Sequence, residues 1–297
     1  MKGREDDMNE NTEYKARSQF TSVMHRLKKN RLAMLGLTIL LIMAAVAVFA
    51  GLIADYDTDV IGQDTANRLQ GPSGEHWFGT DQFGRDVFAR IIFGARYSLT
   101  LSIIAMLIAV AIGAIIGSIA GFYGGIRDNI LMRLMDILLA IPPMLMSISI
   151  VAALGQSMAN LLIALSIAYI PVFARVIRSS IMSIKDQEFI EAAKCCGSSD
   201  KHIIFKHIIP NAIGPIIVQA TLAMGATILI IASLSFMGLG IQPPASEWGT
   251  MLYEGRDFLR QAPYLVIFPG AAITLAVISL NLLGDGLRDA LDPRLKN

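Results

Sequence analysis

Five stretches without any ionisable side chain limit the folds that this chain can adopt. Residues 32–54, 97–126, 137–174, 208–246 and 261–284 contain no Asp, Glu, Lys, Arg or His. A helix of about 20 apolar residues crosses the hydrocarbon core of a bilayer. It also pairs its own backbone N–H and C=O groups, as a lipid environment requires. The sequence therefore predicts an all-α polytopic membrane protein.

Turn residues divide these stretches into six predicted transmembrane helices. The stretch 137–174 is too long for one span, and Gly155 lies near its middle. The predicted spans are residues 32–54, about 97–121, 131–154, 158–177, 211–237 and 264–283. The first span is longer than the roughly 7–15 apolar residues of a cleaved signal peptide, so we expect it to remain as an anchor.

The segments outside the spans complete the predicted organisation. They are an N-terminal segment at 1–31, an outer loop at 55–96, a core at 97–284 that contains the loop 183–210 and an outer loop at 238–262, and a tail at 285–297. Within the first outer loop, residues 85–99 have an apolar face opposite Arg85, Asp86, Arg90 and Arg96. We expect an interfacial amphipathic helix there; the alternative is that these arginines face a substrate.

The distribution of charge predicts the orientation of the chain. Six spans place both termini on one side of the membrane. If that side is the cytoplasm, the cytoplasmic segments hold 19 of the 25 Lys and Arg residues, in agreement with the positive-inside rule. Cys195 and Cys196 then face a reducing compartment, and we expect free thiols. The net charge of +1 gives no basic surface for nucleic acid.

Small residues within the spans predict how the helices pack. Gly113, Gly117, Gly121 and Gly125 recur every four residues, which on a helix makes a smooth stripe against which another helix can pack closely. Pro142-Pro143, Gly214-Pro215 and Pro269-Gly270 fall inside three other spans. Each proline removes a backbone hydrogen bond, so we expect three broken helices. The breaks would either line an internal pathway or serve packing alone.

Ionisable groups are nearly absent from the predicted spans, which argues against a self-powered ion-coupled carrier. Asp136 is either a functional buried carboxylate or an interfacial group paired with Arg133. The sequence has no H-E-x-x-H, G-x-S-x-G or G-x-x-x-x-G-K-[ST] motif. We therefore expect no enzyme activity, no metal and no cofactor in this chain.

The charged loop at 183–210 has the pattern of two short capped helices. Ser183 or Asp186 is expected to cap the first, with Gly197 at its left-handed end, and Ser199 or Asp200 to cap the second. A small apolar face is shared by Phe189, Ala192, Ala193 and Cys196. Such a helix can insert into a groove on another protein; the alternative is an ordinary solvated linker.

This loop resembles the EAA loop of ABC-importer permeases. Glu191-Ala192-Ala193, Gly197 and Pro210 have the spacing of that motif, whereas His207 and Ile209 depart from it. Further segments resemble the "C" permeases for dipeptides and oligopeptides. They are residues 76–81 (HWFGTD), 84–86 (GRD), 236–240 (FMGLG), 284–289 (GDGLRD) and 292–294 (DPR).

The resemblance implies a type I (MetI-like) importer fold in the cytoplasmic membrane of a prokaryote. It implies a homologous "B" permease, two ABC ATPase subunits that use ATP and Mg, an external solute-binding protein and a peptide cargo. Glu191, Ala192, Ala193 and Gly197 would couple the chain to an ATPase. Substrate-binding residues cannot be assigned in this way. Alternatives are a nickel-chelate or glutathione cargo with the same mechanism, an ion-coupled carrier, and a membrane scaffold.

Overall fold

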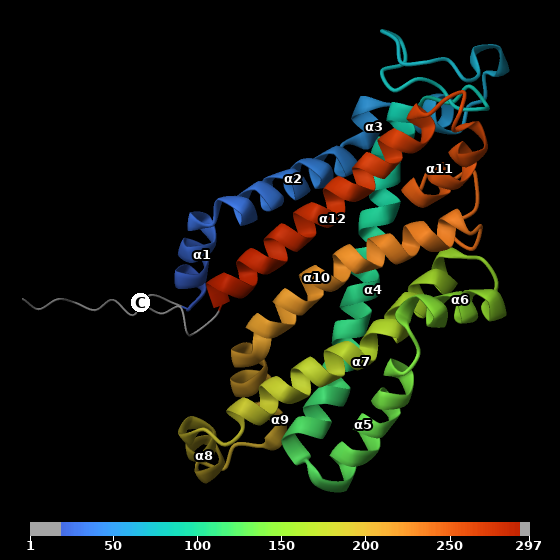
Figure 1. Ribbon diagram of the computed structural model, residues 1–297. Coiled ribbons are helices and arrows are strands. Elements are labelled where there is room, and N and C mark those ends of the chain that lie inside the picture. Colours follow the sequence, from blue (N-terminus) through green and yellow to red (C-terminus); the bar gives the residue numbers. More distant parts are fainter. Residues whose placement is uncertain (1–18, 292–297) are drawn as a thin grey trace, which may run out of the picture.

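The computed structural model describes residues 19–291, and its long helices coincide with the apolar stretches (Figure 1). The helices are α1 Gln19–Lys29, α2 Arg31–Val48, α3 Ala50–Ile53, α4 Val87–Tyr123, α5 Gly125–Leu139, α6 Pro143–Leu154, α7 Met158–Ile184, α8 Glu188–Cys195, α9 Asp200–His202, α10 Ile209–Phe236, α11 Trp248–Gly255 and α12 Tyr264–Leu291. Short π-helical turns at Tyr56–Val60 and Ile203–Ile208 and 3₁₀ turns at Thr65–Asn67 and Arg256–Phe258 complete the secondary structure.

The pair α4 and α7 forms the centre of the bundle, and glycines allow their close approach. A Cβ atom added at Gly113 would lie 2.7 Å from the Cβ of Phe173, and one at Gly117 would lie 2.5 Å from the carbonyl oxygen of Ala174. Gly121 faces α7 in the same way, but Gly125 has open space around it. The expectation that Gly125 extends the stripe is therefore wrong, because the chain turns at Gly124 and starts α5.

The main apolar core lies where α10 joins this pair. Its fully buried members include Leu101 and Met106 of α4, Leu165 and Phe173 of α7, and Ile231 of α10. On the other side α12 packs against both α10 and α2, so that α2, α12, α10 and α7 run side by side while α4 crosses them (Figure 1). This packing makes one continuous bundle.

Helix α4 corrects the prediction for residues 85–99. It is a single helix of 37 residues, about 55 Å long, and so exceeds the ~30 Å hydrocarbon core of a bilayer. No separate interfacial helix precedes it in the described chain, since residues 87–99 form its first turns. The excess length carries these turns into the outer part of the molecule.

The third predicted span is not one straight helix. Pro142 and Pro143 separate α5 from α6, and the two helices meet at 84°. The other two predicted breaks are wrong, because α10 continues through Pro215 and α12 through Pro269. Residues 19–291 thus contain five helices that could cross a membrane, or six spans if the bent pair counts as one.

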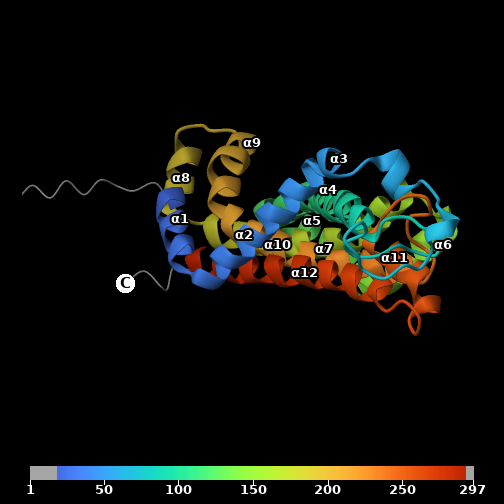
Figure 2. The same ribbon diagram turned by 90° about the horizontal axis from the view of Figure 1, so that it is seen from above.

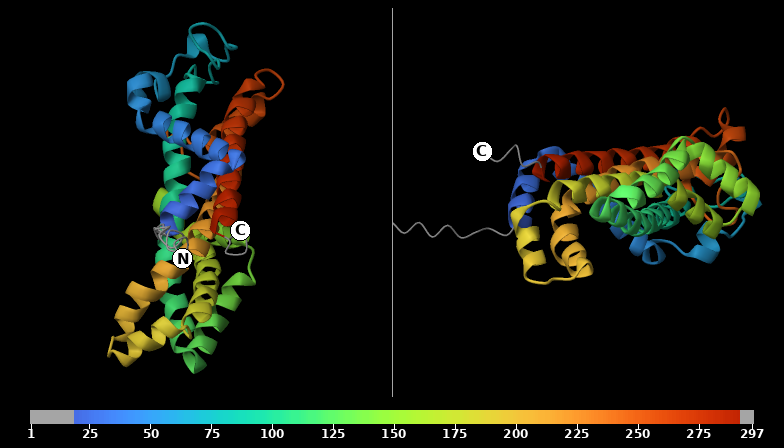
Figure 3. Two further views of the ribbon diagram at one scale, coloured as in Figure 1. Left: turned by 90° about the vertical axis from the view of Figure 1, so that its left-hand side faces the viewer. Right: turned by 90° about the horizontal axis from the view of Figure 1, so that it is seen from below.

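The first described helix and the last turn of the last one lie at the same end of the bundle, which supports the count of six membrane spans. Leu27 of α1, Ala33 of α2 and Ala290 of α12 form one buried cluster, so the first and last described helices meet. Figure 2 shows α1, α8 and α9 at one end of the bundle and α3, α6 and α11 at the other. The right-hand view of Figure 3, from below, agrees with this arrangement. The chain therefore crosses the bundle an even number of times, with α5 and α6 together making one crossing.

Candidate functional site

The helix α8 projects from the end of the bundle at which α1 and α12 meet (Figure 2). It begins after Gln187 and has no side-chain cap at its first turn. The predicted caps Ser183 and Asp186 are wrong, because α7 continues to Ile184, seven residues beyond the predicted span, and includes Ser183. Only a short connection therefore remains between the membrane helix and α8, which ties the orientation of α8 to that of α7.

The end of α8 is a well-defined turn. Gly197 has a φ of +79°, its N–H donates to the carbonyl of Lys194 at 2.9 Å, and the Ser198 N–H donates to the carbonyl of Ala193 at 3.1 Å. This is the Schellman motif, whose left-handed residue is usually glycine. The Ser199 hydroxyl then accepts from the His202 N–H at 3.4 Å and caps α9. The turn thereby fixes the direction from α8 to α9.

The second helix of the loop runs directly into the membrane. Asp200–Phe236 is a continuous helical segment of 37 residues, in which Ile203–Ile208 is π-helical. Pro210, which directly precedes the predicted span 211–237, therefore lies inside a helical segment that has already begun at Asp200. A displacement of α9 is consequently transmitted to α10 without a flexible joint.

One side of α8 is anchored and the other is exposed. Ile190 is fully buried in the same core as Ile203 and Ile208. Sequence reasoning missed Ile190 as the anchor, although it is a large aliphatic residue in a helix rich in small and charged ones. Of the predicted coupling residues, Glu191, Ala192 and Gly197 are exposed and Ala193 is half-buried. An exposed, anchored helix of this kind can bind a partner without unfolding.

A second polar feature joins α5 and α7. Asp128 accepts two hydrogen bonds from Arg178, at 2.5 and 2.6 Å, and Asp136 accepts one from Arg175 at 2.6 Å. The predicted pairing of Asp136 with Arg133 is therefore wrong. The packing of α5 against α7 brings Arg175 opposite Asp136. The two pairs border a groove of about 420 Å³, lined by Met132, Asp136, Arg175, Arg178 and Ser179.

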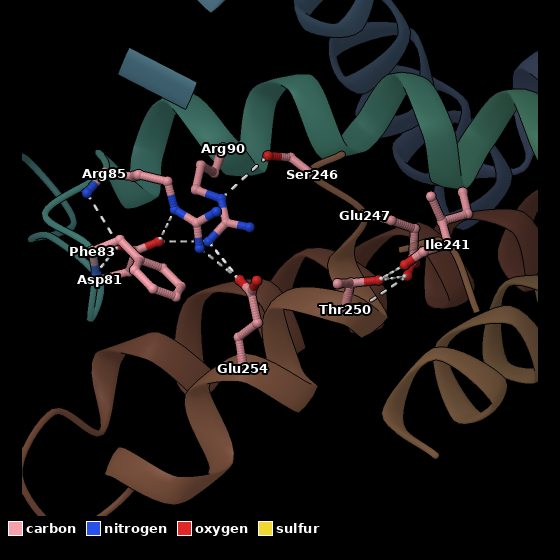
Figure 4. A network of polar contacts seen from close by, with 9 residues as sticks. All are labelled: Asp81, Phe83, Arg85, Arg90, Ile241, Ser246, Glu247, Thr250 and Glu254. Carbon is pink, nitrogen blue, oxygen red and sulfur yellow. Dashed lines mark hydrogen bonds and ion pairs between the residues drawn. The ribbon is translucent and has the colours of Figure 1, made fainter. Parts of the chain in front are cut away.

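A third polar feature lies at the opposite end of the bundle, where α11 packs against α4, and Figure 4 shows its side chains. Asp81 Oδ2 accepts from Arg85 Nε and from Arg90 Nη1, both at 2.6 Å. Glu254 Oε2 of α11 lies 2.9 Å from Arg85 Nη2 and 2.8 Å from Arg90 Nη1. The four side chains are between 2% and 9% exposed. The expectation that Arg85 and Arg90 lie on a solvated face is therefore wrong.

This cluster, formed by Asp81, Arg85, Arg90 and Glu254, connects three parts of the outer end. It joins the loop before α4, the first turns of α4, and α11. Trp248, almost completely buried, donates from Nε1 to the carbonyl of Ile91 at 3.0 Å and adds a second link between α11 and α4. These contacts tie the segment before α4 to both α4 and α11. The charges of the cluster balance internally, so the cluster is not itself a binding site for a free ion.

Arg96 has a different role from the other arginines of this region. Its guanidinium donates to the carbonyl oxygens of Ala47 and Val48, the latter at 2.9 Å. These carbonyls belong to the last turn of α2, whose backbone oxygens have no partner within the helix. The positive charge of Arg96 also complements the negative C-terminal end of the α2 dipole. Arg96 therefore fixes the C-terminal end of α2 against α4.

Comparison with known proteins decides what kind of protein carries these features. Residues 113–297 match the family described as binding-protein-dependent transport system inner membrane component. The chain belongs to this family. Residues 18–72 also match the N-terminal transmembrane domain of oligopeptide transport permease C. As a family member, the chain is the permease subunit of an ABC importer and works with other subunits.

Relatives of this permease differ in the cargo that their names state. The dipeptide transport system permease protein DppC of Alkalihalophilus pseudofirmus is 48% identical over 285 residues, which are 96% of this chain and 93% of the relative. The glutathione transport system permease protein GsiD is 44% identical over 280 residues in Escherichia coli and in Shigella boydii, covering 94% of this chain and 92% of each relative. The similarity extends over nearly the whole chain in each case.

Proposed function

We propose that this permease carries short peptides into the cytoplasm and that α8 is the contact through which an ATPase subunit drives it. The observation that carries the proposal is the structure of α8. Ile190 holds the helix to the bundle, Gly197 fixes its end, and Glu191 and Ala192 remain exposed. The chain has no nucleotide-binding loop of its own, so ATP hydrolysis is assigned to a partner.

Short peptides are the cargo that both groups of relatives support. One relative is named for dipeptide transport and the others for glutathione, which is itself a tripeptide. A dipeptide or oligopeptide is our first proposal, because that relative has the higher identity to this chain and because residues 18–72 match the oligopeptide permease description. Glutathione is the second candidate.

The proposed assembly contains this chain, a homologous permease, two ATPase subunits and an external solute-binding protein. ATP is a cytoplasmic compound, so the end of the bundle that carries α8 faces the cytoplasm in this proposal. The excess of Lys and Arg in the segments assigned to that side agrees with the orientation. The outer loop with its buried cluster then faces the binding protein.

The two cysteines allow a direct test of the docking surface. Cys195 and Cys196 are exposed, lie at the end of α8 and are the only cysteines of the chain. A maleimide reagent should modify both in the isolated permease. Addition of the ATPase subunits should slow the modification at least about tenfold, because burial at an interface excludes the reagent.

A cysteine placed at the outer end provides the control. Gly74 has no atom within 4 Å of an added Cβ, so Gly74→Cys should be tolerated and should react at the same rate with and without the ATPase. If the ATPase co-purifies with the permease and yet leaves Cys195 and Cys196 fully reactive, α8 is not the docking helix.

A further inference from the structure

The groove between α5 and α7 contains an ion pair of a kind that a lipid-facing surface does not carry. Arg175 lies within the predicted fourth span at 158–177 and nine residues before the end of α7 at Ile184, about 14 Å along the axis. Charged side chains within a membrane-spanning segment face protein or a water-filled cavity. The exposed faces of Arg175 and Asp136 therefore point toward an aqueous space in the assembled importer.

Helix α5 separates this polar side from an apolar one. Ile126, Ile130, Leu134 and Ile137 form an exposed stripe along the helix. Asp136 lies about 100° from Ile137 around the helix axis, on the side toward α7. The stripe is suited to lipid or to another helix, whereas the side of Asp136 borders the groove. The two surfaces of α5 thus have different neighbours.

The two ion pairs of the groove differ in how readily they can open. Arg178 binds Asp128 through two parallel hydrogen bonds, and these side chains are 30% and 16% exposed. Arg175 and Asp136 share a single contact and are 54% and 43% exposed. A bidentate pair is the stronger kind, and an exposed single contact is weak because water competes with it. Charges of a ligand can therefore replace the Asp136–Arg175 contact.

The charges of the groove match a molecule with one positive and one negative end. Arg175, Arg178 and Asp136 line it, and Asp128 neutralises Arg178 from outside the lining, so the charges balance and the groove favours neither anions nor cations. A volume of about 420 Å³ is within the usual ~300–1,000 Å³ range of small-molecule pockets. A short peptide at neutral pH has a free ammonium and a free carboxylate. It can satisfy both members of an opened pair.

We propose that Asp136 and Arg175 form a clamp for the termini of a peptide in transit, an inference that rests on the proposed peptide cargo. Arg175 binds the peptide carboxylate and Asp136 binds its ammonium group when their mutual contact opens. Asp128 and Arg178 keep α5 and α7 in register meanwhile. After release of the peptide the Asp136–Arg175 contact re-forms, so the site does not hold its cargo tightly.

The test uses the complete importer in proteoliposomes and three radiolabelled probes. These are dialanine, N-acetyl-dialanine and dialanine amide, each at a concentration that saturates the binding protein. Rates of each variant are divided by the wild-type rate for the same probe, so that selection by the binding protein cancels. Asp136→Asn should reduce dialanine and dialanine amide uptake about tenfold, and N-acetyl-dialanine uptake less than twofold. Arg175→Gln should reduce uptake of dialanine and N-acetyl-dialanine about tenfold, and uptake of dialanine amide, which has no free carboxylate, less than twofold.

Conservative variants and a neighbouring pair provide the controls. Asp136→Glu and Arg175→Lys keep the charges and should retain at least a third of the dialanine uptake. Asp128→Asn breaks the bidentate pair and should affect all three probes equally. If Asp136→Asn and Arg175→Gln also affect all probes equally, or none of them, the clamp is wrong although peptide transport stands. If the wild-type importer moves neither dialanine nor an oligoalanine nor glutathione, the peptide cargo itself is wrong and the clamp falls with it.

Discussion

Gly197→Val should reduce ATP-driven uptake by the assembled importer at least about tenfold. Gly197 has a φ of +79°, and a β-branched residue in this left-handed conformation costs roughly 1–2 kcal/mol, or a factor of about 5–30 in the population of the native turn. The turn sets the direction from α8 to α9, which continues into α10. Its loss therefore misplaces the proposed docking helix. The measurement is uptake of radiolabelled dialanine by proteoliposomes.

Gly197→Asn is the matched control. Asparagine adopts the left-handed conformation more readily than other non-glycine residues, and no atom lies within 4 Å of an added Cβ at this position. The asparagine variant should keep at least half of the uptake. Both variants should reach the membrane in equal amounts, as a blot would show. Equal activity of the valine and asparagine variants would mean that the geometry of this turn does not matter for coupling.

Asp81→Asn should be among the most destabilising substitutions in the chain. Asp81 accepts hydrogen bonds from Arg85 Nε and Arg90 Nη1 and, through Oδ1, from the backbone N–H groups of Phe83 and Arg85. When Asp81 loses its charge, Glu254 is the one carboxylate of the cluster left to neutralise the two buried guanidinium groups. Breaking a buried pair in this way costs about 3–5 kcal/mol. The melting temperature of the purified permease in detergent should fall by roughly 10 °C.

The control for this substitution is Asp57→Asn in the same outer segment. Asp57 is exposed, and among residues 19–291 its side chain has no hydrogen bond or ion pair. Surface substitutions usually change stability by less than about 0.5 kcal/mol, so its melting temperature should not change measurably. A similar melting temperature for the Asp81 and Asp57 variants would show that the buried cluster does not stabilise the outer end.

Much of the membrane architecture is predictable because lipid imposes a simple requirement. An apolar stretch must pair its own backbone groups, so residues 158–177 and 264–283 are helical in the structure as expected. The bend at Pro142-Pro143 was foreseen as a break, but its angle of 84° depends on how α6 packs against α7. Gly214-Pro215 shows the opposite case, since α10 continues as one helix through it.

The ion pairs could not be predicted because they join residues far apart in the sequence. Arg90 and Glu254 are 164 positions apart and meet only after α11 packs against α4. Arg175 lies inside the predicted fourth span at 158–177, so its place on a membrane helix was predictable, but its partner was not. Asp136 is 39 positions away, and the packing of α5 against α7 brings the two side chains together.

Uptake of radiolabelled dialanine by proteoliposomes that contain the whole importer tests the central proposal most directly. The proposal predicts accumulation that requires ATP and the ATPase subunits and that a Glu191→Lys substitution on α8 abolishes, since a reversed charge at a docking surface disfavours association. Accumulation that proceeds without the ATPase subunits, or that the Glu191→Lys variant supports at the wild-type rate, would contradict it.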